Sequence, residues 1–95
     1  MDGPDELIHQ SLRLKIMAAL RNEPGEAALE FKRLKSITGA TDGNLGRQIT
    51  TLADAGYIAV AKDFHENRPR TRAKITKKGA AAFDAHVAYL KSLIG

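Results

Sequence analysis

Four polar residues between Thr41 and Ala55 recur at the spacing of one helix face: Asn44, Arg47, Gln48 and Thr51. At ~100° per residue they fall within an arc of roughly 100°, and Leu45, Ile49 and Leu52 cluster on a separate side. Arginine can donate two hydrogen bonds to a guanine edge, and asparagine or glutamine can bond an adenine edge. The pattern predicts a helix over 41–55 that buries aliphatic groups and presents base-reading groups. The alternative is an ordinary solvated helix surface.

A second feature with chemical meaning is the distribution of charge. The chain of 95 residues carries 15 basic and 11 acidic side chains, a formal net charge of +4. Segment 62–78 holds seven of the cations against Asp63 and Glu66, a net +5, which leaves −1 for the other residues. Charge of one sign gathered in one place indicates a polyanionic partner. The seven cations are Lys62, Arg68, Arg70, Arg72, Lys74, Lys77 and Lys78.

The middle of this basic segment is predicted to be the tip of a hairpin. Alternating residues indicate strands over 57–64 and 71–75, with a loop over 65–70 between them and Ala73 and Ile75 facing inward. Asn67-Arg68-Pro69-Arg70 places two guanidiniums on either side of a stiff proline. Arginines so placed can enter a narrow minor groove or pair with phosphates. Lys77 and Lys78 oppose the dipole of the next helix, which favours a phosphate contact over lysines that are merely tolerated.

These groups need a scaffold of helices, which the apolar spacing predicts. Helices are expected over 5–21, 30–38, 41–55 and 77–94, with a brief strand or extended connection over 26–29. Pro4, Thr41 and Thr76 suit helix starts, and Gly39 and Gly56 suit helix ends. The fold class is mainly α with a small β-hairpin (α+β). The order helix, short strand, helix, helix, strand, wing, strand, helix is that of a winged helix-turn-helix, here a single domain over 1–95.

The last predicted helix, 77–94, is apolar around about half of its circumference. One stripe contains Phe83, Val87, Leu90 and Ile94, and the neighbouring stripe contains Ala82, His86, Tyr89 and Leu93. Such a wide apolar arc exceeds what one intramolecular neighbour would cover in a small chain. We therefore expect a homodimer with Ala82, His86, Tyr89 and Leu93 at its interface.

The chain resembles a known family in its turn, third helix and wing. Residues 38–49 and 52–58, Arg68-Pro69-Arg70-Thr71, and Gly79 with Ala82-Phe83 are similar to small stand-alone MarR- and ArsR-like winged-helix regulators of bacteria and archaea. The resemblance covers roughly residues 10–90 and implies dimeric, sequence-specific DNA binding. It implies DNA contacts for Asn44, Arg47, Gln48 and Thr51 and, in the wing, for Arg68 and Arg70. Gly46 and Gln48 stand where relatives often have serine and histidine, so base preference does not carry over.

Several classes of function are disfavoured by composition. The sequence has no cysteine, and its three histidines, His9, His65 and His86, fall on separate elements, so we expect no metal and no cofactor. No P-loop, carboxylate pair or Ser/His/Asp arrangement stands out, so an enzyme is not expected. No apolar run approaches the roughly 18–20 residues of a membrane span. The expected location is cytoplasmic, on the nucleoid.

The function expected from these features is that of a regulator bound to double-stranded DNA, with helix 41–55 in the major groove and wing 64–72 on the minor groove or phosphates. The alternative is a winged-helix protein–protein interaction module without specific DNA binding. RNA binding fits the charge, but few aromatic residues are placed to stack bases. The expected DNA contacts are Thr41, Asn44, Arg47, Gln48, Thr51, Asn67, Arg68, Arg70, Arg72, Lys77 and Lys78.

Overall fold

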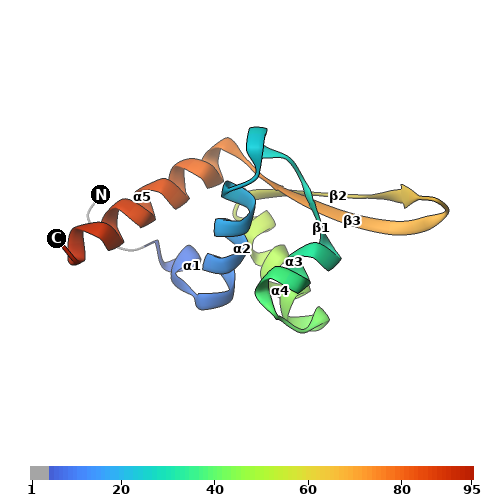
Figure 1. The fold of residues 1–95 in the computed structure, drawn as a ribbon, viewed down its shortest axis with the longest axis horizontal. Coiled ribbons are helices and arrows are strands. Elements are labelled where there is room, and N and C mark those ends of the chain that lie inside the picture. Colours follow the sequence, from blue (N-terminus) through green and yellow to red (C-terminus); the bar gives the residue numbers. More distant parts are fainter. Residues whose placement is uncertain (1–4) are drawn as a thin grey trace.

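A computed structural model describes residues 5–95 and shows a helical body from which a long hairpin projects (Figure 1). The expected helix start at Pro4 lies outside the described residues. The elements are α1 Glu6–His9, α2 Ser11–Arg21, a 3₁₀ turn Pro24–Glu26, β1 Leu29–Glu30, α3 Phe31–Thr38, α4 Asp42–Asp54, β2 Ile58–His65, β3 Arg68–Ile75 and α5 Lys77–Leu93. The strands form one antiparallel sheet in the order β1-β3-β2. The predicted winged-helix order is confirmed.

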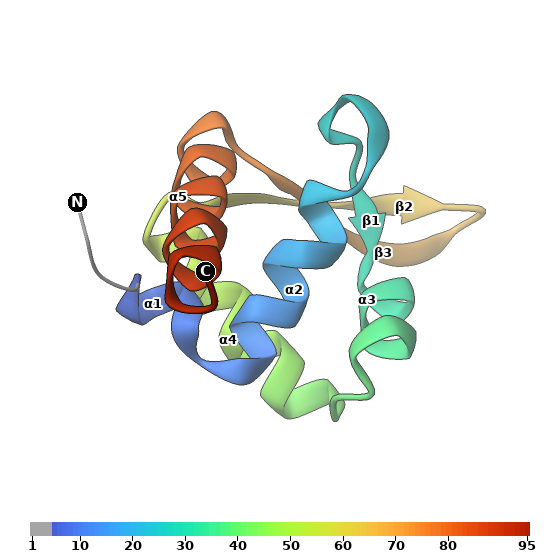
Figure 2. The same ribbon diagram turned by 60° about the vertical axis from the view of Figure 1, so that its left-hand side comes forward.

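Helix α2 runs through the middle of the body and contacts α3, α4, α5 and strand β3 (Figures 1 and 2). The hairpin of β2 and β3 extends from one end of the molecule, and the C-terminal end of α5 lies at the opposite end of its longest dimension, 50 Å. Helices α3 and α4 lie on the same side of the sheet. The wing and the end of α5 are therefore available for separate contacts.

The core is aliphatic and is built around α2. Fully burying one such side chain stabilises the fold by roughly 1.5–3 kcal/mol. Leu45, Ile49 and Leu52 of α4 are buried, as their spacing predicts, and so are Ala73 and Ile75 of the hairpin. The remaining buried apolar residues are Ile8, Leu12, Ile16, Met17, Leu20, Leu34 and Ile58.

The single first helix predicted over 5–21 is wrong, because the chain breaks at Gln10. Gln10 has extended backbone angles (φ −62°, ψ 133°), and its side chain accepts a hydrogen bond from the Arg13 amide at 2.9 Å. It therefore caps α2, while the carboxylate of Asp5 caps the separate helix α1. The apolar spacing continues across the break because Ile8 and Leu12 both reach the core. Periodicity alone could not reveal the break.

The hairpin is longer than predicted, and its loop shorter. Strands β2 and β3 meet at a two-residue turn, Glu66-Asn67, whose φ angles are +52° and +63°. Two positive φ values characterise the turn that best matches the twist of a hairpin. Pro69, predicted in a loop, pairs with Phe64. It is tolerated there because β1 pairs only with Arg72 and Ala73, which leaves the outer half of β3 as an edge.

A small polar network fastens α1 to α5 and to the start of β2. The Tyr57 hydroxyl donates to the Asp5 carboxylate at 2.7 Å, and the Asp5 amide donates to His86 Nδ1 at 3.1 Å. The hydrogen bond to Asp5, aided by burial, raises the pKa of Tyr57 to about 12. His86 is only 1% exposed and its ring contacts that of His9. This differs from the dimer stripe expected on α5, because His86 is covered within its own chain.

The rest of that stripe divides between the core and the surface. Ala82 is half-buried and packs with Phe83 against the core, and Tyr89 is half-buried. Leu93 and Ile94 are 63% and 87% exposed. Within this stripe, the well-exposed apolar surface is thus at the C-terminal end of α5. Among residues 5–95, no helix is long and apolar enough to cross a membrane.

Gly79 controls how closely α5 approaches the turn after α4. A Cβ at this position would overlap the Tyr57 carbonyl and press on Ile75. We expect Gly79→Ala to lower the free energy of unfolding by about 1–3 kcal/mol, the usual cost of overpacking. The control is Gly46→Ala, because nothing lies within 4 Å of a Cβ there. Alanine in that helix interior should raise stability by about 0.5–1 kcal/mol. Urea denaturation followed by circular dichroism measures both, and equal stability of the two variants would contradict the packing.

Candidate DNA-binding interface

Helix α4 is fixed at its first turn as well as along its buried side. The Thr41 hydroxyl accepts a hydrogen bond from the Asn44 amide at 3.2 Å, the N-cap predicted from the sequence. Lys35 of α3 forms an ion pair with Asp42 at 2.8 Å, which links the two helices across their turn. Gly39 takes the left-handed conformation (φ +72°) that ends α3. The helix-turn-helix is therefore closed by short-range contacts.

The exposed side of α4 is displaced from the one expected. The exposed residues of the helix are Asp42, Gly43, Arg47, Thr50 and Asp54, and Asn44, Gln48 and Thr51 are half-buried. At ~100° per residue, the centre of the side formed by Gly43, Arg47, Thr50 and Asp54 is rotated by roughly 80° from the centre of the expected base-reading side. The rotation is toward Gly43 and Thr50. The Thr51 hydroxyl donates to the Arg47 carbonyl at 3.1 Å. The Arg47 side chain is exposed, and its guanidinium donates no hydrogen bond within residues 5–95.

Gln48 has a structural partner that sequence reasoning missed. Its Oε1 accepts from Arg13 Nη1 at 2.6 Å, and its Nε2 donates to Asn44 Oδ1 at 3.2 Å. Arg13 also donates through Nε to the Leu7 carbonyl, so it joins α1, α2 and α4. Both ends of the Gln48 amide are used inside the chain. Gln48 therefore holds the rotation of α4 and orients Asn44.

The two faces of the wing carry different chemistry, because side chains alternate along a strand. Arg68, Arg70, Arg72 and Lys74 share one face of β3. The other face carries Val60, Lys62 and Thr71, which line a groove of about 330 Å³ together with Phe31, Gly46, Ile49, Thr50 and Ala53. Lys62 and Thr50, absent from the expected contacts, therefore lie where the wing meets α4. The sequence indicates Lys62 through its position in the basic segment. Its place in the alternation of side chains along β2 decides which face of the wing it occupies.

Two of the wing arginines are already paired. Arg70 donates from Nε and Nη2 to the two oxygens of Asp63 at 2.9 and 3.0 Å, and Arg72 Nη2 donates to the same carboxylate at 2.8 Å. These bonds, above all the one from Arg70, hold the pKa of Asp63 below its usual value, and the same contact raises the pKa of Arg70. The expectation that both arginines are open to phosphate does not match this arrangement.

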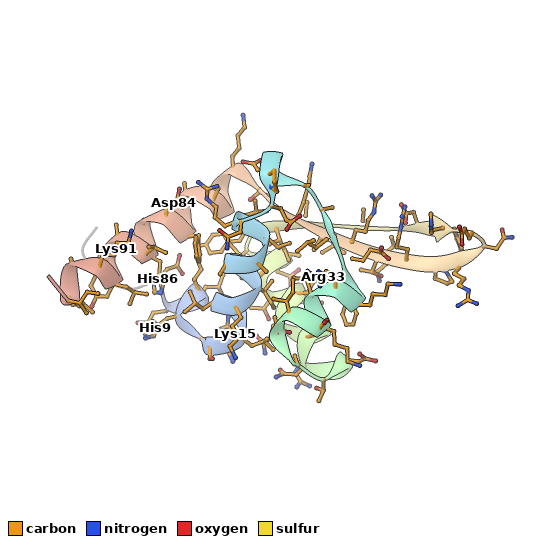
Figure 3. All side chains as sticks on the ribbon, viewed as in Figure 1. His9, Lys15, Arg33, Asp84, His86 and Lys91 are labelled. Atoms are coloured by element: carbon orange, nitrogen blue, oxygen red, sulfur yellow. The ribbon has the colours of Figure 1, made fainter. Side chains whose placement is uncertain are left out.

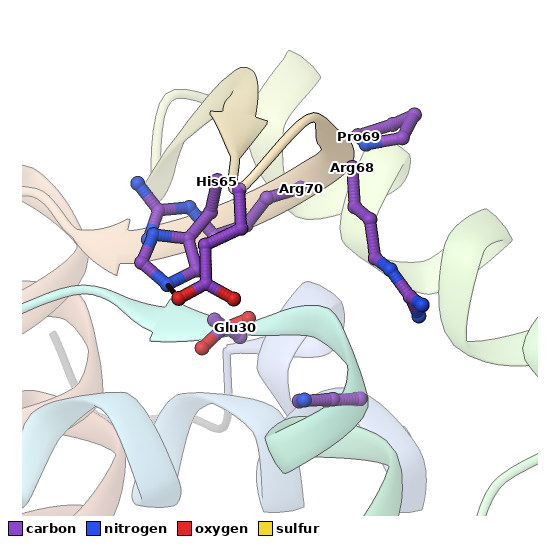
Figure 4. A pocket seen from close by; sticks show the side chains of 7 residues that line it. Glu30, His65, Arg68, Pro69 and Arg70 are labelled. Carbon is purple, nitrogen blue, oxygen red and sulfur yellow. Dashed lines mark ion pairs between the residues drawn. The ribbon is translucent and has the colours of Figure 1, made fainter.

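The tip of the wing leaves Asn67 and Arg68 exposed. Arg68 extends away from His65 and Arg70 (Figure 4). It borders a hollow of about 370 Å³ that Glu30, Lys32 and Glu66 also line. Both acidic and basic side chains line this hollow, so its charge is mixed. Arg68 is the arginine of the wing that the structure leaves extended toward solvent.

Lys77 and Lys78 lie at the opposite end of α4 from its capped N-terminus. Lys78 Nζ donates to the Ala55 carbonyl at 2.9 Å and lies 5.6 Å from the centre of the Tyr57 ring. A cation at a helix C-terminus interacts favourably with the helix dipole. Lys78 thus serves as an intramolecular cap for α4, which differs from its expected phosphate contact. Lys77 is exposed.

The histidines do not assemble a metal centre in the described part of the chain, where no group of three His, Cys, Asp or Glu residues is placed to hold a metal ion. His9 and His86 face each other from α1 and α5 with ring centroids 5.4 Å apart (Figure 3). His65 lies on the wing, 3.8 Å from the Glu66 carboxylate.

Comparisons with known proteins agree with this geometry. A family model described as a winged helix DNA-binding domain matches residues 12–94. An uncharacterized protein of Methanocaldococcus jannaschii is 33% identical over 82 residues, which cover 86% of each chain. A solved transcriptional regulator homologue from Pyrococcus horikoshii OT3 is 28% identical, with a TM-score of 0.84 over 95% of this chain and 86% of that one. A solved Salmonella typhimurium chain shares the fold at 17% identity, with a TM-score of 0.74 over 93% of this chain and 75% of that one. The chain belongs to the winged helix DNA-binding domain family.

Proposed function

We propose that the chain is a transcriptional regulator that binds double-stranded DNA with α4 in the major groove and the wing beside it. The observation that carries the proposal is the exposed side of α4, which carries Arg47 and Thr50, with Thr50 lining the groove between the helix and the hairpin that extends from the body (Figure 1). An α-helix with its side chains measures about 10–12 Å across, and the major groove is about 12 Å wide. The Pyrococcus horikoshii relative supports the regulatory role by its name.

The residues divide between base reading and backbone contact. Arg47 is the best-placed base reader, with the amide nitrogen of Asn44 beside it and the Thr41 hydroxyl at the helix start. Lys62 and Thr50 approach the backbone from the groove between wing and helix. Asn67 and Arg68 reach furthest along the duplex. Backbone contacts provide most of the affinity, and base contacts provide the sequence choice.

The remaining expected contacts take other roles in this proposal. Gln48 and Lys78 support α4 from within the chain. Lys77 is exposed beside the same end of the helix and adds to the positive potential. Thr51 contacts its own helix backbone at the edge of the exposed side. A protein with these roles works where the chromosome is, so we place it in the cytoplasm on the nucleoid.

A dimer is the second part of the proposal, and the exposed pair Leu93 and Ile94 favours it. They lie at the far end of the molecule from the wing, with half-buried Tyr89 one turn earlier. Two copies joined there by a two-fold axis would direct their wings outward. For such a two-fold dimer we expect half-sites about one helical turn apart, roughly 34–36 Å, or a multiple of that distance.

We expect light scattering after size exclusion to give twice the chain mass of 10.3 kDa. The double variant Leu93→Glu/Ile94→Glu should give the chain mass, because it places two charges in the interface. Ile37 is exposed on α3, and Ile37→Glu serves as the control that should remain dimeric. A monomeric parent at every concentration would contradict the dimer.

Selection from a random pool of DNA duplexes at two salt concentrations tests the regulator proposal. We expect enrichment of a two-part motif at the higher salt, because non-specific phosphate binding weakens there. Retention without enrichment would refute sequence-specific regulation. No retention at either concentration would favour the protein-interaction alternative, with the exposed end of α5 as its surface.

Arg47→Ala should change base preference, whereas Gln48→Ala should change the stability of the fold. Arg47→Ala should relax preference at one base pair by about 1–3 kcal/mol and leave unfolding unchanged, because Arg47 has no intramolecular side-chain partner in the described chain. Gln48→Ala should lower the free energy of unfolding by about 1 kcal/mol, because Arg13 loses its acceptor. Urea titration and binding to single-base variants of the selected site measure both. Equal effects of the two variants on the free energy of unfolding would contradict the assignment of Arg47 to base reading and of Gln48 to support of α4.

A further inference from the structure

We propose that Asp63 is an intramolecular competitor of DNA phosphate, which withholds Arg70 and Arg72 and so limits the non-specific affinity of the wing. This rests on the proposed function, because it assumes that the wing approaches DNA. Asp63 of β2 is directly opposite Arg70 of β3, and Arg72 is its diagonal neighbour on the same face. One carboxylate therefore meets two guanidiniums.

The geometry of the contact is the one that arginine uses for a phosphate. Arg70 presents two parallel N–H groups, Nε and Nη2, to the two oxygens of Asp63 at 2.9 and 3.0 Å. Bidentate pairing of this kind recognises carboxylate and phosphate alike. A DNA phosphate that binds Arg70 through the same donors must displace the Asp63 carboxylate from them. Arg72 Nη2 is held on the same oxygen that Arg70 Nη2 contacts, at 2.8 Å.

Partial burial strengthens the competition. The side chains of Arg70, Arg72 and Asp63 are 22%, 37% and 36% exposed, so water solvates the three groups only in part. The Nε of Arg72 is buried and has no hydrogen-bond partner. The Asp63 carboxylate therefore leaves one donor of the Arg72 guanidinium unsatisfied. A DNA phosphodiester also presents two charged oxygens, so it can take the place of the Asp63 carboxylate on these donors.

Removing the Asp63 charge should strengthen the binding of the wing to DNA. Asp63→Asn removes the negative charge, keeps nearly the same shape and frees both arginines. We expect binding to a random-sequence duplex to become about three- to tenfold tighter near 100 mM salt. The slope of log K against log salt should steepen by about 1 for each phosphate gained. Asp63→Thr, which also removes the charge and suits a strand, provides a second variant in case the first folds poorly.

The chain offers a matched control on the opposite side of the body. Asp84 of α5 accepts two hydrogen bonds from Arg21 at 3.0 and 3.0 Å, so Asp84→Asn releases a bidentate arginine with the same change in net charge. Asp84 lies on α5, well away from the wing (Figure 3). The triple variant Asp63→Asn/Arg70→Ala/Arg72→Ala tests whether the gain requires the two arginines.

Fluorescence anisotropy with the duplex over a salt series is the first readout, and elution from phosphocellulose is the second. Relative to the parent chain, we expect Asp63→Asn to bind the duplex more tightly and to elute later from phosphocellulose. We expect no change for Asp84→Asn and no gain for the triple variant. Weaker binding by both Asp63 variants, or equal gains for Asp63→Asn and Asp84→Asn, would overturn it. If no variant binds DNA while the phosphocellulose shift persists, the proposed function fails and the competition by Asp63 stands.

Discussion

The burial of one side of α4 against α2 is the constraint on which the rest of the surface depends. Leu45, Ile49 and Leu52 are inserted into the core, and each contributes roughly 1.5–3 kcal/mol. That burial fixes the rotation of the helix and therefore decides which polar residues face outward. Arg13 adds a polar restraint to the same rotation through Gln48. The position of Arg47 relative to the wing follows from these contacts.

Much of this arrangement could be predicted from the sequence, because it depends on local signals. The cap at Thr41, the left-handed Gly39 and the buried aliphatic side of α4 follow from residue type and spacing. The intramolecular partners of polar residues could not be predicted in the same way. Gln48 and His86 face residues far away along the chain, which periodicity does not identify. For that reason the exposed side of α4 is rotated from the expected base-reading side, and the exposed part of the α5 stripe is narrower than expected.

In the basic segment too, the sequence does not identify the intramolecular partners of the charged residues. The sequence locates its net charge, but a sum of charges does not say which cations already have partners. The register of the hairpin would have shown Asp63 opposite Arg70, and the predicted loop over 65–70 concealed that register. The two-residue turn at Glu66-Asn67 is what brings the two residues together. The wing is therefore less positive toward solvent than its composition suggests.

The assignment of α4 and the wing as the DNA-binding surface is tested most directly by NMR, with backbone amide chemical shifts followed as a duplex carrying the selected site is added. We expect the largest changes in the first half of α4, around Lys62 and at the turn with Asn67. Small changes are expected along the exposed end of α5, where Leu93 lies. Changes concentrated on α5, with α4 and the wing unaffected, would contradict the assignment of the DNA-binding surface.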